Sequence, residues 1–78
     1  MVNQKLYIIN LSNFYDIINE LKEHIGYEIF KFDSKEIFFD KYKSKSISTE
    51  NSIMVVHEKE YNFFVKNINE DQIIKLKP

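Results

Sequence analysis

Apolar residues follow two different periods in the first third of the chain. Residues 6–9 form a continuous apolar run between polar neighbours, which is typical of a central strand in a parallel sheet. The next apolar residues recur at helical spacing, at Phe14, Ile17, Ile18, Leu21 and Ile25. Ser12 is expected to cap the start of this helix, and Gly26 is expected to end it in a left-handed conformation. The pattern predicts a strand followed by a helix of about four turns.

A second strand and a second helix follow. Residues 27–32 alternate, with a charge on each face, which predicts a strand nearer the edge of the sheet. Residues 33–36 have the form of a capping box, with Asp33 as the cap and Glu36 reaching back. The second helix that begins there carries an apolar stripe of Ile37, Phe38 and Tyr42, with Phe39 at its border. The polar, Ser-rich run 43–52 predicts a loop.

The last third of the chain completes an α/β sheet. Residues 53–56 repeat the pattern of the first strand, so we expect a parallel neighbour on its other side and the strand order 2-1-3. Right-handed crossovers then place the two main helices on opposite faces. Because only a few polar residues precede residues 61–66, we expect a strand there in a C-terminal hairpin. Residues 72–77 are predicted to form the last strand, ending at Pro78.

Composition bounds the class of protein. Seventy-eight residues make a single domain, 1–78, and seven Phe and five Tyr supply large side chains for a small core. The chain has no Cys, which excludes disulfides and thiolate zinc sites and favours a reducing, cytoplasmic location. No apolar stretch approaches the roughly 18 residues of a membrane span, and no signal peptide is recognisable. With a net charge of −1 and no Arg, nucleic-acid binding by these residues is not expected.

Several segments together resemble the opening half of a response-regulator receiver domain. The similar segments are Leu6-Tyr7-Ile8-Ile9, Gly26-Tyr27-Glu28-Ile29 and Asp33-Ser34-Lys35-Glu36, in the order and spacing of that family. The likeness covers roughly residues 5–56 and returns at Lys77-Pro78, which matches the Lys-Pro pair that ends the family's fifth strand. The resemblance implies a flavodoxin-like, receiver-like sheet, shortened after the third strand. It also implies either that the chain is the N-terminal piece of a longer regulator, or that the domain dimerises through the sheet face that a receiver's last helix would cover.

The chain departs from the family where the chemistry takes place. Receivers carry two acidic residues after the first strand and a phosphoaccepting Asp after the third, and here Asn10, Leu11 and His57 stand at those positions. Mg²⁺ requires carboxylate oxygens, and phosphoryl transfer requires that metal. Lys77 matches the switch lysine, which has no phosphoryl group to contact. We therefore expect no metal, no other cofactor, no small-molecule substrate and no enzymatic activity.

Other candidate residues favour structural roles. A lone His57 beside a turn is more often a surface residue than a metal ligand or phosphoacceptor. Glu58 and Glu60 lie in a predicted turn without an apolar pocket, so we expect them to be solvated. Phe63 and Phe64 suggest a stacking platform for single-stranded nucleic acid, but the mixed charge nearby favours core packing.

The resemblance also implies a function. A receiver covers its last strand with a further helix, and without it Ile73, Ile74 and Leu76 would be open to water as an interface. We expect a phosphorylation-independent pseudo-receiver, a protein-interaction or dimerisation module of a transcriptional regulator that reaches DNA only through a separate downstream domain. The alternative is a free-standing small α/β protein that binds a partner, such as an antitoxin-like protein or a phage inhibitor.

Overall fold

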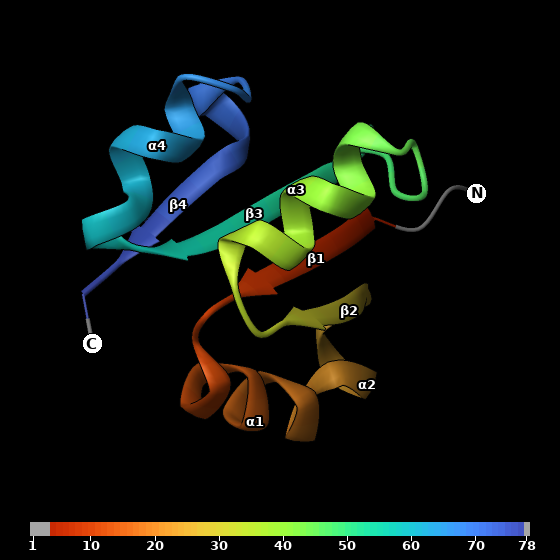
Figure 1. Ribbon diagram of the computed structural model, residues 1–78. Coiled ribbons are helices and arrows are strands. Elements are labelled where there is room, and N and C mark those ends of the chain that lie inside the picture. The colour runs from red at the N-terminus through yellow and green to blue at the C-terminus, as the bar shows by residue number, and fades with distance from the viewer. Residues whose placement is uncertain (1–3, 78) are drawn as a thin grey trace.

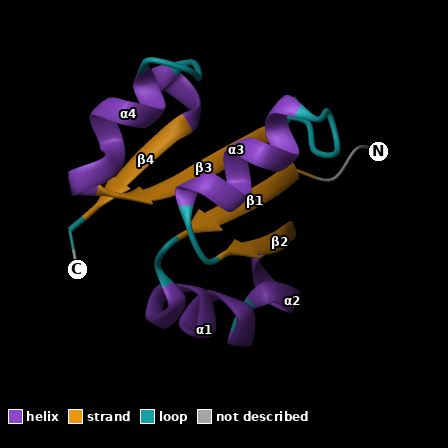
Figure 2. Ribbon diagram, viewed as in Figure 1, coloured by secondary structure: helices purple, strands orange, loops and turns teal. Residues whose placement is uncertain are grey.

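Four parallel strands form one sheet in the computed structural model, which describes residues 4–77 (Figures 1 and 2). The strands are β1 (Gln4–Ile9), β2 (Tyr27–Phe32), β3 (Ser52–His57) and β4 (Ile73–Leu76), in the order β2-β1-β3-β4. The expected parallel pairing of the first three strands is confirmed, with β1 between β2 and β3. The Lys-Pro match includes Pro78, which lies outside the described residues.

The first helical segment is broken into two. Helix α1 spans Ser12–Glu20, and the short α2 spans Lys22–Ile25. Gly26 ends α2 with a φ of 76°, in the left-handed conformation expected for it. Ser12 is not the cap: Leu11 holds the cap position and offers no side-chain hydrogen bond. Because Leu21 leaves the helical conformation, the expected apolar stripe does not continue through it, and its side chain is 47% exposed.

Ser34, and not Asp33, caps α3 (Lys35–Lys43). The Ser34 hydroxyl oxygen accepts a hydrogen bond of 3.2 Å from the backbone N–H of Ile37, so the predicted capping box does not form. The buried side of α3 also differs from the expected one. Ile37, expected in the apolar stripe, is 43% exposed, whereas Phe39, expected at its border, is buried. Phe39 is buried because a further helix, absent from the predicted fold, packs beside α3 and places the Phe64 ring 5.1 Å from the Phe39 ring.

That further helix replaces the predicted C-terminal hairpin. The chain between β3 and β4 forms the 3₁₀ turn η1 (Glu58–Glu60), the helix α4 (Tyr61–Val65) and the 3₁₀ turn η2 (Glu70–Gln72). It returns to pair β4 parallel to β3, so the prediction of a strand at residues 61–66 is wrong. The whole stretch 58–72 is long enough for a crossover, which needs a dozen or more residues. The hairpin prediction counted only the residues before Tyr61 as the connection, and these are too few for a crossover.

Two apolar layers enclose the sheet, one on each face. Helices α3 and α4 cover one face, and α1 covers part of the other, as Figure 1 shows, so the expectation of helices on opposite faces is confirmed. The first layer contains Tyr7, Ile9, Phe32, Phe38, Phe39, Met54, Val56, Phe64, Ile68 and Ile73. The second contains Leu6, Ile8, Leu11 and Val55, with Phe14, Tyr15 and Ile18 of α1 packed against it. The first layer is rich in aromatic side chains in tilted and edge-to-face contact, which compensates for the small size of the domain.

Candidate functional site

The residues that follow β1, β2 and β3 meet at one edge of the sheet. In a parallel sheet this carboxyl edge is where side chains from different loops converge and where ligands bind. Asn10 follows β1 in the left-handed region, with a φ of 58°, which Asn tolerates better than most residues. Its backbone N–H donates to the carbonyl of Phe32 at 2.8 Å, which extends the ladder between β1 and β2 by one bond. The position of Asn10 is therefore set by the backbone at the ends of two strands.

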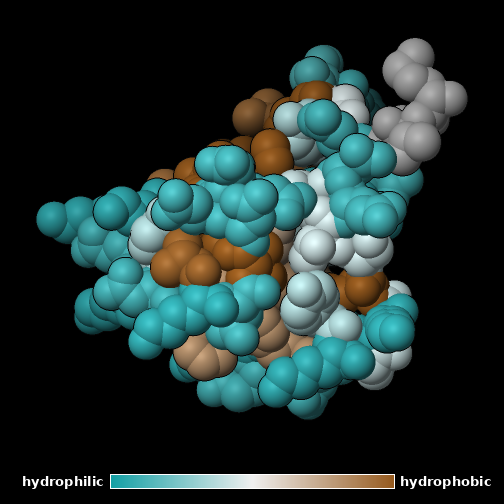
Figure 3. All heavy atoms as spheres, turned by 90° about the horizontal axis from the view of Figure 1, so that it is seen from above, coloured by the Kyte–Doolittle hydropathy of each residue, from teal (hydrophilic) through white to brown (hydrophobic). Residues whose placement is uncertain are grey.

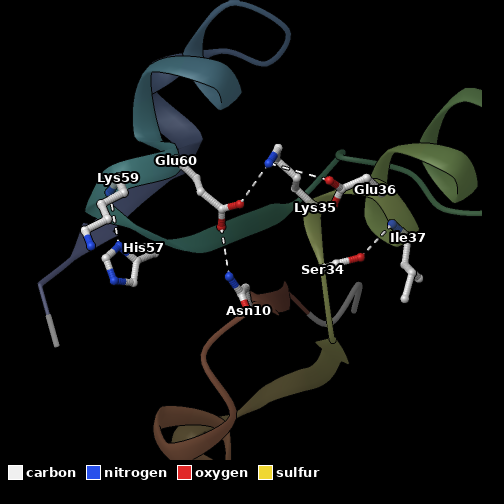
Figure 4. A network of polar contacts seen from close by, with 8 residues as sticks. All are labelled: Asn10, Ser34, Lys35, Glu36, Ile37, His57, Lys59 and Glu60. Atoms are coloured by element: carbon white, nitrogen blue, oxygen red, sulfur yellow. Dashed lines mark hydrogen bonds and ion pairs between the residues drawn. The ribbon is translucent and has the colours of Figure 1, made fainter.

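Glu60 joins the loops that follow these three strands. One of its carboxylate oxygens accepts a hydrogen bond from the Asn10 side-chain amide at 3.4 Å, and the other lies 3.3 Å from the Lys35 ammonium (Figure 4). The Glu60 side chain is only 16% exposed. The expectation that Glu60 is a solvated turn residue is therefore wrong. We call Asn10, Lys35 and Glu60 the edge network.

In the edge network, the positive charge of Lys35 compensates the negative charge of Glu60. The hydrogen bond to Glu60, followed by the charge of Glu36, raises the pKa of Lys35 above its ordinary value. A backbone hydrogen bond, followed at a smaller size by the charge of Lys35, holds the pKa of Glu36 below its ordinary value. Lys35 therefore stays protonated, and the Glu60 carboxylate already has a cation beside it.

His57 lies at the same edge but outside the edge network. Its ring nitrogen Nδ1 accepts a hydrogen bond of 3.1 Å from the backbone N–H of Lys59, and Figure 4 shows its ring directed away from the Glu60 carboxylate. Glu58, its neighbour, is exposed. His57 is thus held by its own turn.

The donor set at this edge does not suit a divalent cation. Within residues 4–77, no group of three or more His, Asp or Glu side chains is arranged to hold a metal ion. Mg²⁺ prefers carboxylate oxygens in near-octahedral geometry. The Glu60 carboxylate, which lies beside Asn10, is engaged by Lys35 and Asn10. Lys77 follows β4 with an exposed side chain.

Asn10, Leu11 and His57, singled out from the sequence, are brought together by the fold. All three line one cavity of about 360 Å³ between the start of α1 and the ends of β1, β3 and β4. Its other lining residues are Ser12, Asn13, Phe14, Ile17 and Leu76. We call this the switch-point cavity, because it opens between β1 and β3, from whose ends the chain leaves toward opposite faces of the sheet.

The expected interface residues of β4 divide between its two faces. Ile73 belongs to the core beneath α3 and α4 and is 7% exposed, so the expectation that it is open to water is wrong. Ile74 lies on the α1 side of the sheet and is 51% exposed. Leu76 is partly buried against the layer on that same side. The sequence pattern could not separate them, because alternation alone does not say which face of an edge strand is covered.

The sequence analysis did not predict the edge network. The helix α4, in contrast, has a detectable signal in the sequence. Tyr61, Phe64, Val65 and Ile68, all in or against the core, have helical spacing, which is the signal for α4. No comparable signal links Asn10 to Glu60, because the two residues are 50 positions apart.

The fold and the site define a small, all-parallel α/β domain with a charge-compensated network and an apolar cavity at its carboxyl edge. Comparison with known proteins finds no match: no family model, no curated protein and no solved structure is similar to this chain. Within residues 4–77, none of the helices has the length and apolar character needed to cross a bilayer.

Proposed function

We propose that this domain is a flavodoxin-like pseudo-receiver, a protein-interaction module that works without phosphorylation and pairs with a second copy of itself. The resemblance of the sequence to receivers motivates the class, together with the role in a transcriptional regulator. The observation that carries the proposal is an apolar surface on the α1 side of the sheet. We call it the open face and define it by Ile17, Ile53, Ile74 and Leu76.

The open face exists because the two sides of the sheet are covered unequally. Helices α3 and α4 both lie on one side, whereas on the other side α1 and α2 lie near β1 and β2, and no helix of residues 4–77 lies over β4 (Figure 1). Ile74 is consequently 51% exposed and Ile17 is 58% exposed. Neighbouring apolar side chains at this level of exposure are typical of a protein–protein interface.

The open face has two parts that a second copy of the chain can pair with. It combines a ridge, α1 with exposed Ile17, and a shelf formed by β4 with exposed Ile74. A two-fold axis between ridge and shelf would place α1 of each copy on the shelf of the other, as an isologous interface requires. Lys77, which follows the shelf strand, is opposite in charge to Asp16 and Glu20 of α1, and we expect it to pair with one of them across the interface.

Light scattering coupled to size-exclusion chromatography tests self-association. We expect the average mass of the wild type to rise above that of a monomer as its concentration increases. The variant Ile74→Glu is expected to remain a monomer, because burying an unpaired carboxylate at an interface costs several kcal/mol.

The matched control is Ile37→Glu. Ile37 is 43% exposed on α3, on the side of the sheet opposite the open face. Figure 3, which views the molecule from above, shows that other apolar atoms also reach the surface among hydrophilic ones. Association that is lost in Ile37→Glu and kept in Ile74→Glu would move the interface to the α3 side. A wild type that stays monomeric at every concentration contradicts self-association and favours the alternative of a small protein that binds a different partner.

A further inference from the structure

The switch-point cavity has the size and position of a small-molecule site. Its volume of about 360 Å³ falls within the range of roughly 300–1,000 Å³ that is typical of ligand pockets. It lies outside the carboxyl ends of β1 and β3, and in open parallel sheets ligands bind at such points where the strand order reverses. The cavity shares Ile17 and Leu76 with the open face, so a ligand and a second copy of the chain would compete for this surface. The present inference does not rest on the protein-interaction proposal.

The lining of the switch-point cavity is mainly apolar. Leu11, Phe14, Ile17 and Leu76 supply hydrocarbon surface from three separate elements of the fold. Leu11 is 8% exposed and belongs to the core, so this wall is held in place by packing beneath it. Such a wall favours a ligand with an apolar body.

The polar lining supplies hydrogen-bond donors and no carboxylate. Because Nδ1 of His57 accepts a bond from Lys59, the neutral ring carries its hydrogen on Nε2, which leaves Nε2 as a donor. Asn13 adds a side-chain amide. The residues that line the cavity, all within the described chain, include no Asp or Glu. The Glu60 carboxylate, which contacts Asn10 beside the cavity, is compensated by Lys35. The uncapped first turn of α1 is consistent with this polarity but is not needed for it.

We propose that the switch-point cavity binds a small molecule with an apolar body and a single carboxylate, which accepts a hydrogen bond from His57. The apolar walls bind the body and exclude water from it. The carboxylate lies at the rim, where donors are present.

Titration of ¹⁵N-labelled protein with phenylacetate, followed by NMR, tests this proposal. We expect saturable amide shifts at cavity residues such as Leu11, Phe14 and Leu76. The neutral probe phenylacetamide has the same body and is expected to bind about tenfold more weakly, because a charge-assisted hydrogen bond is roughly twice as strong as a neutral one. His57→Ala should remove most of that preference for the carboxylate while leaving phenylacetamide binding nearly unchanged.

Ile17→Asp tests the cavity without disturbing the fold, and Ile74→Glu separates ligand binding from self-association, because Ile17 belongs to both the cavity and the open face. Ile17 is 58% exposed, so Ile17→Asp should leave the fold intact while placing a carboxylate at the mouth of the cavity. We expect phenylacetate binding to weaken at least about tenfold. Ile37→Asp, on the opposite side of the sheet, is the matched control and should bind as the wild type does. The titration is repeated on Ile74→Glu, which lacks the proposed interface but keeps every residue that lines the cavity.

Three results would overturn the proposal. The first is the absence of saturable shifts at the cavity residues with either probe, in both the wild type and Ile74→Glu. The second is unchanged phenylacetate binding in Ile17→Asp. The third is an undiminished preference for the carboxylate in His57→Ala, which would remove His57 from the assignment.

Discussion

Tyr7 links the central strand to the loop before β3. Its side chain is 2% exposed, and its hydroxyl donates a hydrogen bond of 2.8 Å to the carbonyl of Ser48. Burial, followed by the negative charge of Glu28, raises the pKa of Tyr7 above the ordinary value of 10.0. The same residue thus stabilises a loop and couples stability to alkaline pH.

We predict that Tyr7 contributes to a loss of stability at high pH. Folded Tyr7 keeps its proton at pH values where the unfolded chain has lost it, so the unfolded state binds fewer protons and the free energy of unfolding falls as the pH rises above 10.0. Tyr7→Phe should lower the free energy of unfolding at neutral pH by about 1 kcal/mol, through the lost hydrogen bond, and should flatten its decline above pH 10. Urea unfolding over a series of pH values measures both effects.

Tyr15→Phe is the matched control, since it removes the hydroxyl of a partly exposed tyrosine on α1. Lys35, whose pKa is also raised, acts in the same direction in this pH range and remains in both variants. An unchanged alkaline slope in Tyr7→Phe would show that the Tyr7 hydroxyl is not responsible.

At the scale of the elements, α4 shows how a short helix can determine the topology. Phe64 is fully buried, and its ring lies 5.9 Å from the Phe38 ring and 5.1 Å from the Phe39 ring. Phe63, the preceding residue, is 44% exposed. The fully buried Phe64 side chain therefore anchors α4 to the core, and α4 is part of the crossover that brings β4 beside β3.

We predict that truncating the two phenylalanines of α4 to alanine lowers the free energy of unfolding by different amounts. Phe64→Ala should lower the free energy of unfolding by about 3–5 kcal/mol, because it leaves a cavity between α3 and α4. Phe63→Ala, its matched control, should cost only about 1–2 kcal/mol, because the Phe63 side chain is 44% exposed and loses less buried area than Phe64 does. Chemical denaturation of the two variants measures the difference. Similar losses in both would contradict the orientation of α4.

At the scale of the whole molecule, the ends of three strands define what the carboxyl edge can do. The edge network pairs the Glu60 carboxylate with Lys35 and Asn10, and His57 lies beside it at the end of β3. An in-line phosphoryl transfer requires a metal ion to neutralise the developing charge. The Glu60 carboxylate at this edge is already engaged by Lys35 and Asn10.

We predict that acetyl phosphate and Mg²⁺ leave the protein unmodified. Intact-mass spectrometry after incubation should show only the unmodified chain, because no free carboxylate pair is available for the metal at this edge. His57→Ala is the informative variant. A stable phosphorylated species in the wild type contradicts the prediction, and its loss in His57→Ala would assign the phosphoryl group to that histidine.

The sequence predicted much of the fold and less of the site. Strands β1, β2 and β3 were recognisable because an apolar run or an alternation states locally which faces are buried. Gly26 was recognisable because a left-handed residue at a helix end favours glycine. Asn10, Leu11 and His57 were singled out by position, and the structure brings all three to the switch-point cavity. The hairpin was mistaken because residues 61–66 fit a strand when only their apolar content is read.

The sequence by itself determined two properties that depend on neighbours along the chain. These are the type of most elements and the alternation of side chains between the two faces of a strand. The tertiary structure decided which of those faces are covered. Packing against α4 buried Phe39, whereas Ile74 of β4 stayed exposed because no described helix covers that side of the strand. The fold also brought Glu60 into contact with Asn10, 50 positions away in the sequence. The physical reason is that burial and charge pairing depend on the surface that another segment presents, and a local period contains no information about that segment.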